Sequence, residues 1–191
     1  MRARDGDMEI PSRIRILHRP VARPRLEVTP WELRVVLPPG LDEAYAYRLI
    51  ERHRSWITRK YAQLRKTAEE AERLELLNRP LQEFRAMVRD LTRRYAEELG
   101  VEPSNVYVRR MTRKWGSCTA KGKICISSLA RHLPAELVEY LVYHEVCHLV
   151  ERSHRKRFWR LVARRFPNFR ELRKKLLAYQ VKLAMLGLLR L

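Results

Sequence analysis

Hydrophobic and polar positions alternate along residues 13–37, and this pattern predicts short strands. The hydrophobic members of the alternation are Ile14, Ile16, Leu26, Val28, Leu33, Val35 and Leu37. A period of two is typical of a strand that buries one of its faces. Because prolines separate the runs, we expect a small antiparallel β-meander over residues 13–40, ended by Pro38-Pro39-Gly40.

The residues that follow show the three- and four-residue spacing of helices. Hydrophobic side chains recur in this way over residues 41–64, where Asp42 is a candidate N-cap. A second helix is predicted over residues 81–99, because Gly100 supplies a helix stop. The charged stretch 67–78 between them fits either a helix or a linker.

The rest of the chain mixes strands with helices. Strands are predicted over residues 106–111 and 124–129, on either side of a polar segment. Pro134 then opens a helix with hydrophobic first turns, and another helix follows His154 and ends at Pro167. The chain has only 6 glycines, which argues against an all-β protein. The predicted fold class is therefore α+β.

An H-E-x-x-H motif lies in the helix after Pro134, within Tyr143-His144-Glu145-Val146-Cys147-His148. One helical turn separates the two histidines, so both imidazoles leave the same face and can bind one metal ion. The hydrophobic residues before the motif place this helix in the core, where two unpaired histidines would be costly. We therefore predict His144 and His148 as metal ligands.

Two residues compete to be the third ligand, His154 and Glu151. Glu151 shares the helical face of His144 and His148, but it lies about 10 Å along a straight helix from His144. His154 reaches the metal if the chain turns after Glu151. Its distance from His144 along the sequence matches H-E-x-x-H-x-x-G-x-x-H, although Glu151 occupies the glycine position of that pattern. We favour His154 and interpret Glu151 as a partner of a ligand or as a surface acid.

Three imidazoles with a fourth position open to water describe a hydrolytic zinc site, which other divalent metals could also occupy. Zinc lowers the pKa of its bound water to about 7. Glu145 is displaced around the helix from the ligands, so it can take a proton from that water and pass it to the leaving group. Glu145 is therefore the predicted catalytic residue, with one Zn²⁺ as the cofactor.

The chain is strongly basic, with 41 Lys and Arg residues against 22 Asp and Glu and a formal net charge of +19. A field of this sign attracts polyanions such as nucleotides, nucleic acid or an anionic membrane surface. The charge is spread along the whole chain, which favours non-specific attraction over a dedicated nucleic-acid site.

The polar segment 112–123 carries Trp115, Ser117 and four cations, namely Arg113, Lys114, Lys121 and Lys123. It fits either a solvated hairpin tip or an anion-facing rim of the metal cleft. Its glycine spacing excludes a phosphate-binding P-loop. Lys114, Trp115 and Ser117 are candidate substrate contacts, and so is Tyr143 beside the motif.

The cysteines and the two ends of the chain indicate in which cellular compartment the protein is expected. Three cysteines without a C-x-x-C pair favour a reducing environment and argue against a thiolate zinc site. Residues 1–12 are polar and are interpreted as an arm, not a signal peptide, so we expect a cytoplasmic protein. The apolar residues 178–191 are shorter than the roughly 20 needed to span a bilayer. We interpret them as a helix docked on the core or on a second copy of the chain, with membrane anchoring the less favoured reading.

The ordered motifs of the second half are similar to a known family. They are Lys114-Trp115-Gly116-Ser117-Cys118, Pro134, Tyr143 to His148, Ser153-His154, Phe158-Trp159 and Pro167. In this combination the chain resembles the YgjP-like family of metal-dependent hydrolases, which is related to zincin peptidases and somewhat like the SprT-like proteases. The resemblance implies a minimal zincin-like core with a small sheet, and it implies the same three histidine ligands and the same general base.

The predicted organisation is then a 1–12 arm, a 13–40 β-meander, 41–100 connecting helices, a 101–177 zincin-like hydrolase core and a 178–191 apolar helix or tail. The leading hypothesis is a zinc-dependent metallopeptidase acting on a peptide or protein, with Tyr143, His132 or Ser117 as a candidate donor to the oxyanion. One alternative is a nucleoside triphosphate (UTP-type) pyrophosphohydrolase, an activity ascribed to one branch of that family. The other is a nucleic-acid-associated SprT-like protease, recruited by the basic surface.

Overall fold

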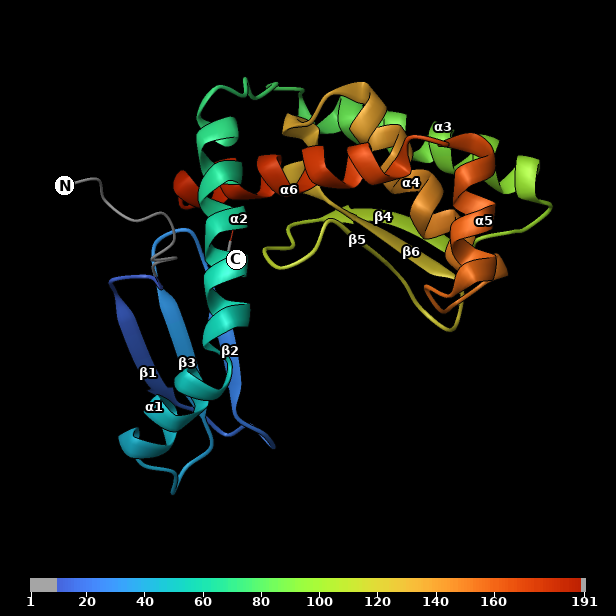
Figure 1. Ribbon diagram of the computed structural model, residues 1–191. Helices are drawn as coiled ribbons and strands as arrows, with labels where there is room; N and C mark the ends of the chain where they lie inside the picture. Colours follow the sequence, from blue (N-terminus) through green and yellow to red (C-terminus); the bar gives the residue numbers. More distant parts are fainter. Residues whose placement is uncertain (1–9, 190–191) are drawn as a thin grey trace. The chain divides into compact units, whose positions relative to one another are not determined.

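The chain forms two compact units, Met1–Glu72 and Arg73–Leu191. A computed structural model describes residues 10–189 (Figure 1). Most of the predicted 1–12 arm therefore lies outside the described residues. The boundary between the units falls within the residues predicted as connecting helices, so the helices of that stretch are divided between the two units.

The first unit contains a three-stranded sheet made of β1 (Ile14–His18), β2 (Arg25–Val28) and β3 (Leu33–Leu37). The strand order is β1-β3-β2. β2 and β3 form an antiparallel hairpin, whereas β1 pairs parallel to β3, with Ile14 opposite Leu33 and Ile16 opposite Val35. The predicted antiparallel meander is thus correct for the hairpin and wrong for β1.

Burial explains why β3 takes the centre of this sheet. Leu33, Val35, Val36 and Leu37 are all fully buried, so β3 needs cover on both faces and a neighbour on both edges. β1 keeps an alternating pattern of isoleucines and arginines, which suits an edge strand. The segment 19–24 carries two prolines and is too long for a tight hairpin, so it leads from β1 to the far side of β3.

Two helices complete the first unit, α1 (Glu43–Arg52) and α2 (Arg54–Glu72). Asp42 caps α1 as predicted, since its carboxylate accepts a hydrogen bond of 2.8 Å from the backbone N–H of Tyr45. A single helix was predicted here, but His53 interrupts it with φ −110° and ψ 13°. The core between helices and sheet contains Leu33, Val35, Leu37, Ala46, Ile50 and Ile57.

The second unit begins with α3 (Leu81–Leu99), which has the predicted bounds. Gly100 ends α3 in the left-handed conformation with φ 64°, the C-cap geometry that glycine adopts at least cost. A second three-stranded sheet follows, with β4 (Asn105–Arg109) and β5 (Gly116–Cys118) on either side of β6 (Lys123–Ser127). β4 is parallel to β6 and β5 is antiparallel to it. The segment between the two predicted strands therefore contains a third one, β5.

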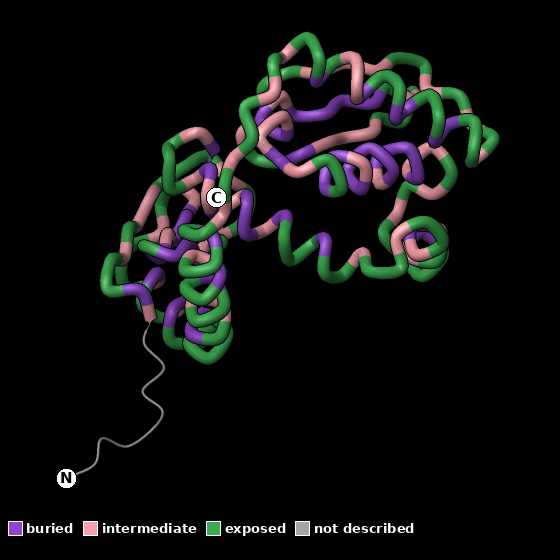
Figure 2. The backbone as a smooth tube through the Cα atoms, turned by 90° about the horizontal axis from the view of Figure 1, so that it is seen from above, coloured by how far each residue is buried: buried purple, intermediate pink, exposed green. Residues whose placement is uncertain are grey.

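A 3₁₀ turn, η1 (Ser128–His132), leads into α4 (Ala135–Val150), α5 (Lys156–Arg165) and α6 (Phe169–Met185). α4 contacts α3, β5, β6, α5 and α6, so it is the central helix of this unit. Nine of its residues are buried, and Figure 2 shows buried residues concentrated in the interior of the unit. The mixed strands and helices confirm the predicted α+β class.

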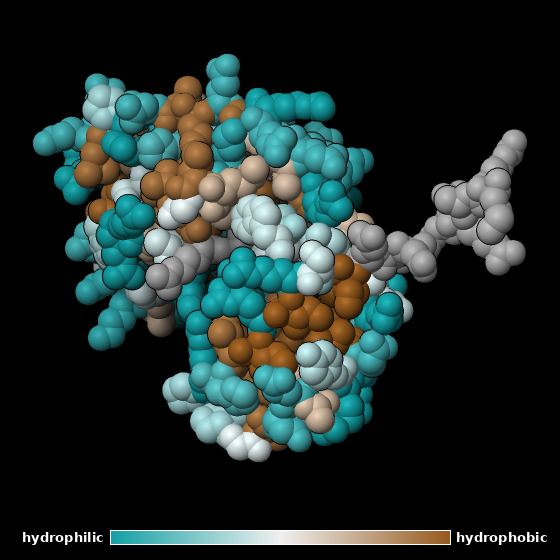
Figure 3. Space-filling model, turned by 90° about the vertical axis from the view of Figure 1, so that its left-hand side faces the viewer, coloured by the Kyte–Doolittle hydropathy of each residue, from teal (hydrophilic) through white to brown (hydrophobic). Residues whose placement is uncertain are grey.

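Polar side chains dominate the face drawn in Figure 3 and surround smaller hydrophobic areas. Among the described residues, no helix combines the length and apolar character that a membrane crossing requires. Residues 178–185 of the predicted apolar C-terminal stretch form the last turns of α6, which ends at Met185, and residues 190–191 lie outside the described residues.

Candidate metal centre

Two histidines project from the last turns of α4, beside one another. The ring centroids of His144 and His148 lie 5.0 Å apart, and both side chains are partly buried. This follows from the four-residue spacing on a helix whose other faces are taken by the core. α4 therefore holds the pair on a rigid element instead of a loop.

The chain turns after α4 and brings His154 back to the pair. Glu151 ends the helix in an extended conformation, with φ −139° and ψ 112°. The ring of His154 then lies with its centroid 5.0 Å from that of His144 and 4.6 Å from that of His148. Trp159 fixes this turn, because its indole N–H donates a 3.0 Å hydrogen bond to the carbonyl of His154.

The hydrogen bonds of His148 show which of its nitrogens is free. Nδ1 lies 3.2 Å from the carbonyl oxygen of Glu151, and a carbonyl can only accept. Nδ1 must therefore carry the proton, which leaves the Nε2 lone pair available to a metal. Nε2 of His154 lies 3.0 Å from Nε2 of His144. Two lone pairs at this distance would need a shared proton or a shared cation between them.

All three imidazoles are held in the neutral form that a metal requires. Burial, followed by the two neighbouring histidines, lowers the pKa of His144 to about 3. Burial also lowers the pKa of His148 and of His154. Nδ1 of His144 is buried and has no hydrogen-bond partner among the described residues, so a protonated ring would be costly at this position.

The geometry of the three nitrogens fits one metal ion. One ligand atom from each of His144, His148 and His154 can be chosen so that all lie within 4.8 Å of one another. Zn–N bonds of about 2.0–2.1 Å in a tetrahedron put the nitrogens about 3.3 Å apart, so small side-chain adjustments suffice. The structure therefore brings the three predicted ligands together.

The competing acid, Glu151, is occupied elsewhere. Its carboxylate accepts hydrogen bonds from the backbone N–H of Ser153 at 3.2 Å and from the Ser153 hydroxyl at 2.9 Å. These bonds lower the pKa of Glu151. Its backbone carbonyl, not its carboxylate, is the group that contacts His148. Glu151 thus orients a histidine through the main chain.

Glu145 is an acid buried beside these histidines. Its side chain is only 6 % exposed, and burial raises its pKa to about 7, with Lys114 acting in the opposite direction. A carboxyl group with a pKa near neutrality can both accept and release a proton under physiological conditions. The charge of Lys114 favours the ionised form, which is the form a general base needs.

Gly116 in β5 gives Glu145 the space that its carboxyl group occupies. A Cβ atom at position 116 would lie 2.5 Å from Oε1 of Glu145 and 2.7 Å from its Cγ. The backbone conformation of Gly116 is not restricted to glycine, since its φ lies outside the positive range. The glycine is therefore required by this close approach and not by a turn.

The substitution Gly116→Ala should displace the Glu145 carboxyl while leaving the histidines in place. We expect any hydrolytic activity of the site to fall by about a hundredfold or more, because a misplaced catalytic carboxyl group costs about that much, while the metal content per chain should stay unchanged. Metal analysis and turnover of one purified sample test this. The control is Thr119→Ala, in the turn that follows β5. Loss of the metal together with the activity would contradict the idea that Gly116 only makes room for Glu145.

The raised pKa of Glu145 also predicts a pH dependence in metal-free protein. The carboxyl group keeps its proton up to about pH 7 in the folded protein, but only up to about pH 4.5 when it is exposed in the unfolded chain. The folded protein therefore loses stability as the pH rises from 4.5 to 7. Glu145→Gln should therefore raise the free energy of unfolding of the metal-free protein at pH 8, by up to about 3 kcal/mol. The difference should vanish below pH 4.5, and denaturant titrations at both pH values measure it. Parallel pH profiles of the two proteins would show that Glu145 is not perturbed.

A comparison with known protein families identifies the family of this chain. The sequence model of a family described as YgjP-like, metallopeptidase domain, matches residues 65–179, more than half of the chain. The chain belongs to the YgjP-like family. This confirms the resemblance drawn from its motifs, and a metal-dependent hydrolase of metallopeptidase type is the activity that the family supports.

Two solved structures similar to this YgjP-like chain are metallopeptidase zymogens. Abylysin of Pyrococcus abyssi is 26% identical, with 47% of this chain and 90% of that chain covered and a TM-score of 0.43. Jannalysin of Methanocaldococcus jannaschii is 20% identical, with 47% and 92% covered and a TM-score of 0.43. No curated protein matches the chain.

The predicted substrate contacts of this YgjP-like domain lie in different parts of the structure. Ser117 lies in β5 and Lys114 just before it, on the side of Glu145. Trp115 is only 8% exposed and belongs to the hydrophobic core. Tyr143 is 1% exposed, and its ring packs edge-on against Tyr95. Both side chains are buried in the core, so the structure offers no support for either as a substrate contact.

Two of the three candidate oxyanion donors are engaged with backbone carbonyl groups. The hydroxyl of Tyr143 points to the carbonyl of Leu161, at 3.5 Å. His132 is tied through Nδ1 to the carbonyl of Leu77, at 2.7 Å, and it is not among the clustered histidines. Of the three candidates, Ser117 alone lies in the strand that contacts Glu145.

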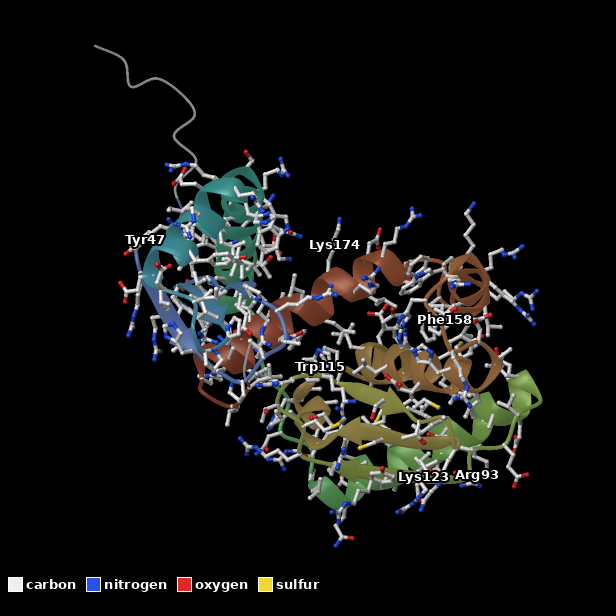
Figure 4. The ribbon with its side chains drawn as sticks, turned by 90° about the horizontal axis from the view of Figure 1, so that it is seen from below. Tyr47, Arg93, Trp115, Lys123, Phe158 and Lys174 are labelled. Atoms are coloured by element: carbon white, nitrogen blue, oxygen red, sulfur yellow. The ribbon has the colours of Figure 1, made fainter. Side chains whose placement is uncertain are left out.

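Aromatic and basic residues of α5 and α6 surround the histidines and were not predicted as site residues. Phe158, labelled in Figure 4, is fully buried and stacks on His148 with centroids 4.5 Å apart. Trp159 stacks on His154 at 5.5 Å. Arg173 contributes to the lowered pKa of His144 and His154 after burial. The Phe158-Trp159 pair was visible in the sequence as a motif, whereas no sequence signal marked Arg173.

Proposed function

We propose that this chain is a zinc-dependent peptidase in which His144, His148 and His154 hold the metal and Glu145 is the general base. The observation that carries the proposal is the meeting of three neutral imidazoles, within 4.8 Å, beside a carboxyl group whose pKa is raised to about 7. The family supports the metal-dependent peptidase, and the geometry supports these residue roles.

Zinc suits this donor set because three imidazole nitrogens and one open position are typical of catalytic zinc sites. When bound, zinc would supply a Lewis acid that polarises a carbonyl group and acidifies water. His148 is oriented for this role by the carbonyl of Glu151, and Phe158 stacks against its ring and limits its movement. The histidines contribute position, since their lowered pKa values keep their lone pairs free.

Glu145 moves the proton. In its ionised form it accepts a proton from the attacking water, and in its neutral form it returns that proton to the leaving amine. Burial keeps its pKa near neutrality, so both steps are accessible near pH 7. Gly116 leaves room for the carboxyl group, because a Cβ atom at that position would collide with it.

A peptide is the substrate that the neighbouring strand suits best. Within the described residues, β5 pairs with β6 on one side and lies at the edge of its sheet. An exposed edge can pair with an extended peptide through main-chain hydrogen bonds. Because Gly116 of this strand touches Glu145, a peptide paired along β5 would pass beside the proposed base. Three free thiols suit a reducing compartment, so we place this activity in the cytoplasm.

The test is a cleavage assay on metal-loaded protein. Purified chain with zinc, manganese or magnesium is incubated with casein and, separately, with a panel of nucleoside triphosphates. We expect peptide bonds to be cleaved and the activity to disappear with a chelator and return with zinc. Release of pyrophosphate without peptide cleavage would replace the peptidase by a nucleotide hydrolase.

A further inference from the structure

A pocket of about 800 Å³ begins at the ligand His154 and extends between α5 and α6. The residues that line it are His154, Lys156, Trp159, Arg160, Ala163, Phe169, Arg170 and Arg173. None of the proposed catalytic steps uses this pocket. Since His154 belongs to both, a group bound in the pocket would lie next to the metal centre.

The lining of this α5–α6 pocket is cationic. It contains Lys156, Arg160, Arg170 and Arg173 and no carboxylate. All four side chains are exposed, and in the described part of the chain none of them forms an ion pair with an acid. Four unneutralised cations around one hollow repel one another, and an anion placed between them would relieve that repulsion.

Two of the guanidinium groups rest on aromatic rings. Arg173 lies over the ring of Trp159 at 4.8 Å, and Arg170 lies over the ring of Phe169 at 5.7 Å. The two rings stack on each other, with centroids 5.1 Å apart and planes 17° apart. A guanidinium held on an aromatic face keeps its N–H edge free, and that edge matches a carboxylate with two parallel hydrogen bonds.

We propose that the α5–α6 pocket is a substrate subsite that binds a carboxylate of the peptide, so that the enzyme prefers substrates with an acidic group beside the cleaved bond. The proposal rests on the proposed peptidase function. A Glu or Asp side chain and the C-terminal carboxylate share this chemistry, and either would be held by Arg170 and Arg173.

A nucleotide fits the pocket less well than an acidic peptide does. A base is normally bound by stacking on an open aromatic face. Trp159 is already contacted by His154 at 5.5 Å, by Phe169 at 5.1 Å and by Arg173 at 4.8 Å. The rings therefore serve as supports for the guanidinium groups and offer little free face to a base.

The experiment uses matched peptides that differ at one position beside the cleaved bond, carrying Glu, Gln or Lys, each with a free or an amidated C-terminus. kcat/KM is measured for the zinc-loaded wild type and for the charge-reversal variant Arg170→Glu/Arg173→Glu. The control is Lys174→Glu, which makes the same kind of charge change on α6 next to Arg173 (Figure 4). Lys174 is not among the residues that line the pocket.

We expect the wild type to prefer the Glu peptide over the Gln peptide by about tenfold or more, as charge-assisted hydrogen bonds allow. The double variant should lose that preference and favour the Lys peptide, whereas the control should behave as wild type. A preference that depends on the free C-terminus and not on the side chain would place the terminal carboxylate in the pocket. Cleavage without any charge preference would overturn the proposal and leave the peptidase function intact.

A binding measurement tests the proposed subsite independently of peptide cleavage. Labelled Glu, Gln and Lys peptides are titrated into zinc-loaded Glu145→Gln protein, with UTP and a single-stranded oligonucleotide as competitors. Selective binding of the Glu peptide that Arg173→Glu abolishes supports the subsite, even if no peptide is cleaved. Equal binding of the three peptides, or loss of the Glu peptide to UTP at far lower concentration, overturns it.

Discussion

Zinc-loaded Glu145→Gln protein should bind its metal as the wild type does and hydrolyse peptides at least about a thousandfold more slowly. The substitution replaces a proton acceptor by an amide of nearly the same shape, so the packing against Gly116 is kept. General acid–base catalysis contributes roughly 10²–10⁴-fold to an enzymatic rate, and this site has one buried acid to supply it. Metal analysis and kcat on one preparation test both halves of this expectation.

The pH dependence of the remaining activity sharpens this test. In the wild type, kcat/KM should rise with pH through an ionisation that belongs to the general base. That rise should be missing in Glu145→Gln, because the amide does not titrate. Glu139→Gln is the matched control, since this acid lies on the same helix but hydrogen-bonds to the Tyr95 hydroxyl instead. Undiminished turnover in Glu145→Gln would show that another group moves the proton.

The sequence predicted those parts of the fold that depend on local spacing. The helix of residues 81–99 was predicted to the residue, because its hydrophobic stripe and Gly100 both act locally. The turn that returns His154 was predicted from the spacing of the motif, and the structure brings this histidine to the other two. Such features need only the geometry of one helix and its end.

Features that depend on contacts distant in sequence escaped prediction. β1 pairs with β3 because the fully buried β3 needs a hydrogen-bonded neighbour on both edges, and the alternation of β1 alone does not show this. Trp115 and Tyr143 are predicted as substrate contacts from their place beside the motifs, but the burial of both side chains depends on packing partners elsewhere in the sequence. Arg173 lies on α6, and its approach to Trp159 and His154 depends on how α5 and α6 pack. A periodic pattern in one segment carries no information about such partners.

His154→Ala and Glu151→Ala should separate the two candidates for the third ligand. In the proposed site three histidines and a water would share the metal, and a structural zinc site gains about 10–16 kcal/mol from four ligands, or about 3 kcal/mol each. Removing His154 should therefore weaken zinc binding by about a hundredfold, and activity should fall with it. His154 is an exposed residue after the end of α4, so its loss should leave the fold intact.

Glu151→Ala should keep its zinc, because the group that orients His148 is the backbone carbonyl, which alanine retains. The exposed His53 in the first unit provides the control, since His53→Ala removes an imidazole without touching the cluster. Competition with a chromogenic chelator measures the affinity of each variant, and circular dichroism verifies the fold. If Glu151→Ala lost its zinc while His154→Ala kept it, the third ligand would be the carboxylate, and the base would act beside a two-histidine, one-glutamate centre.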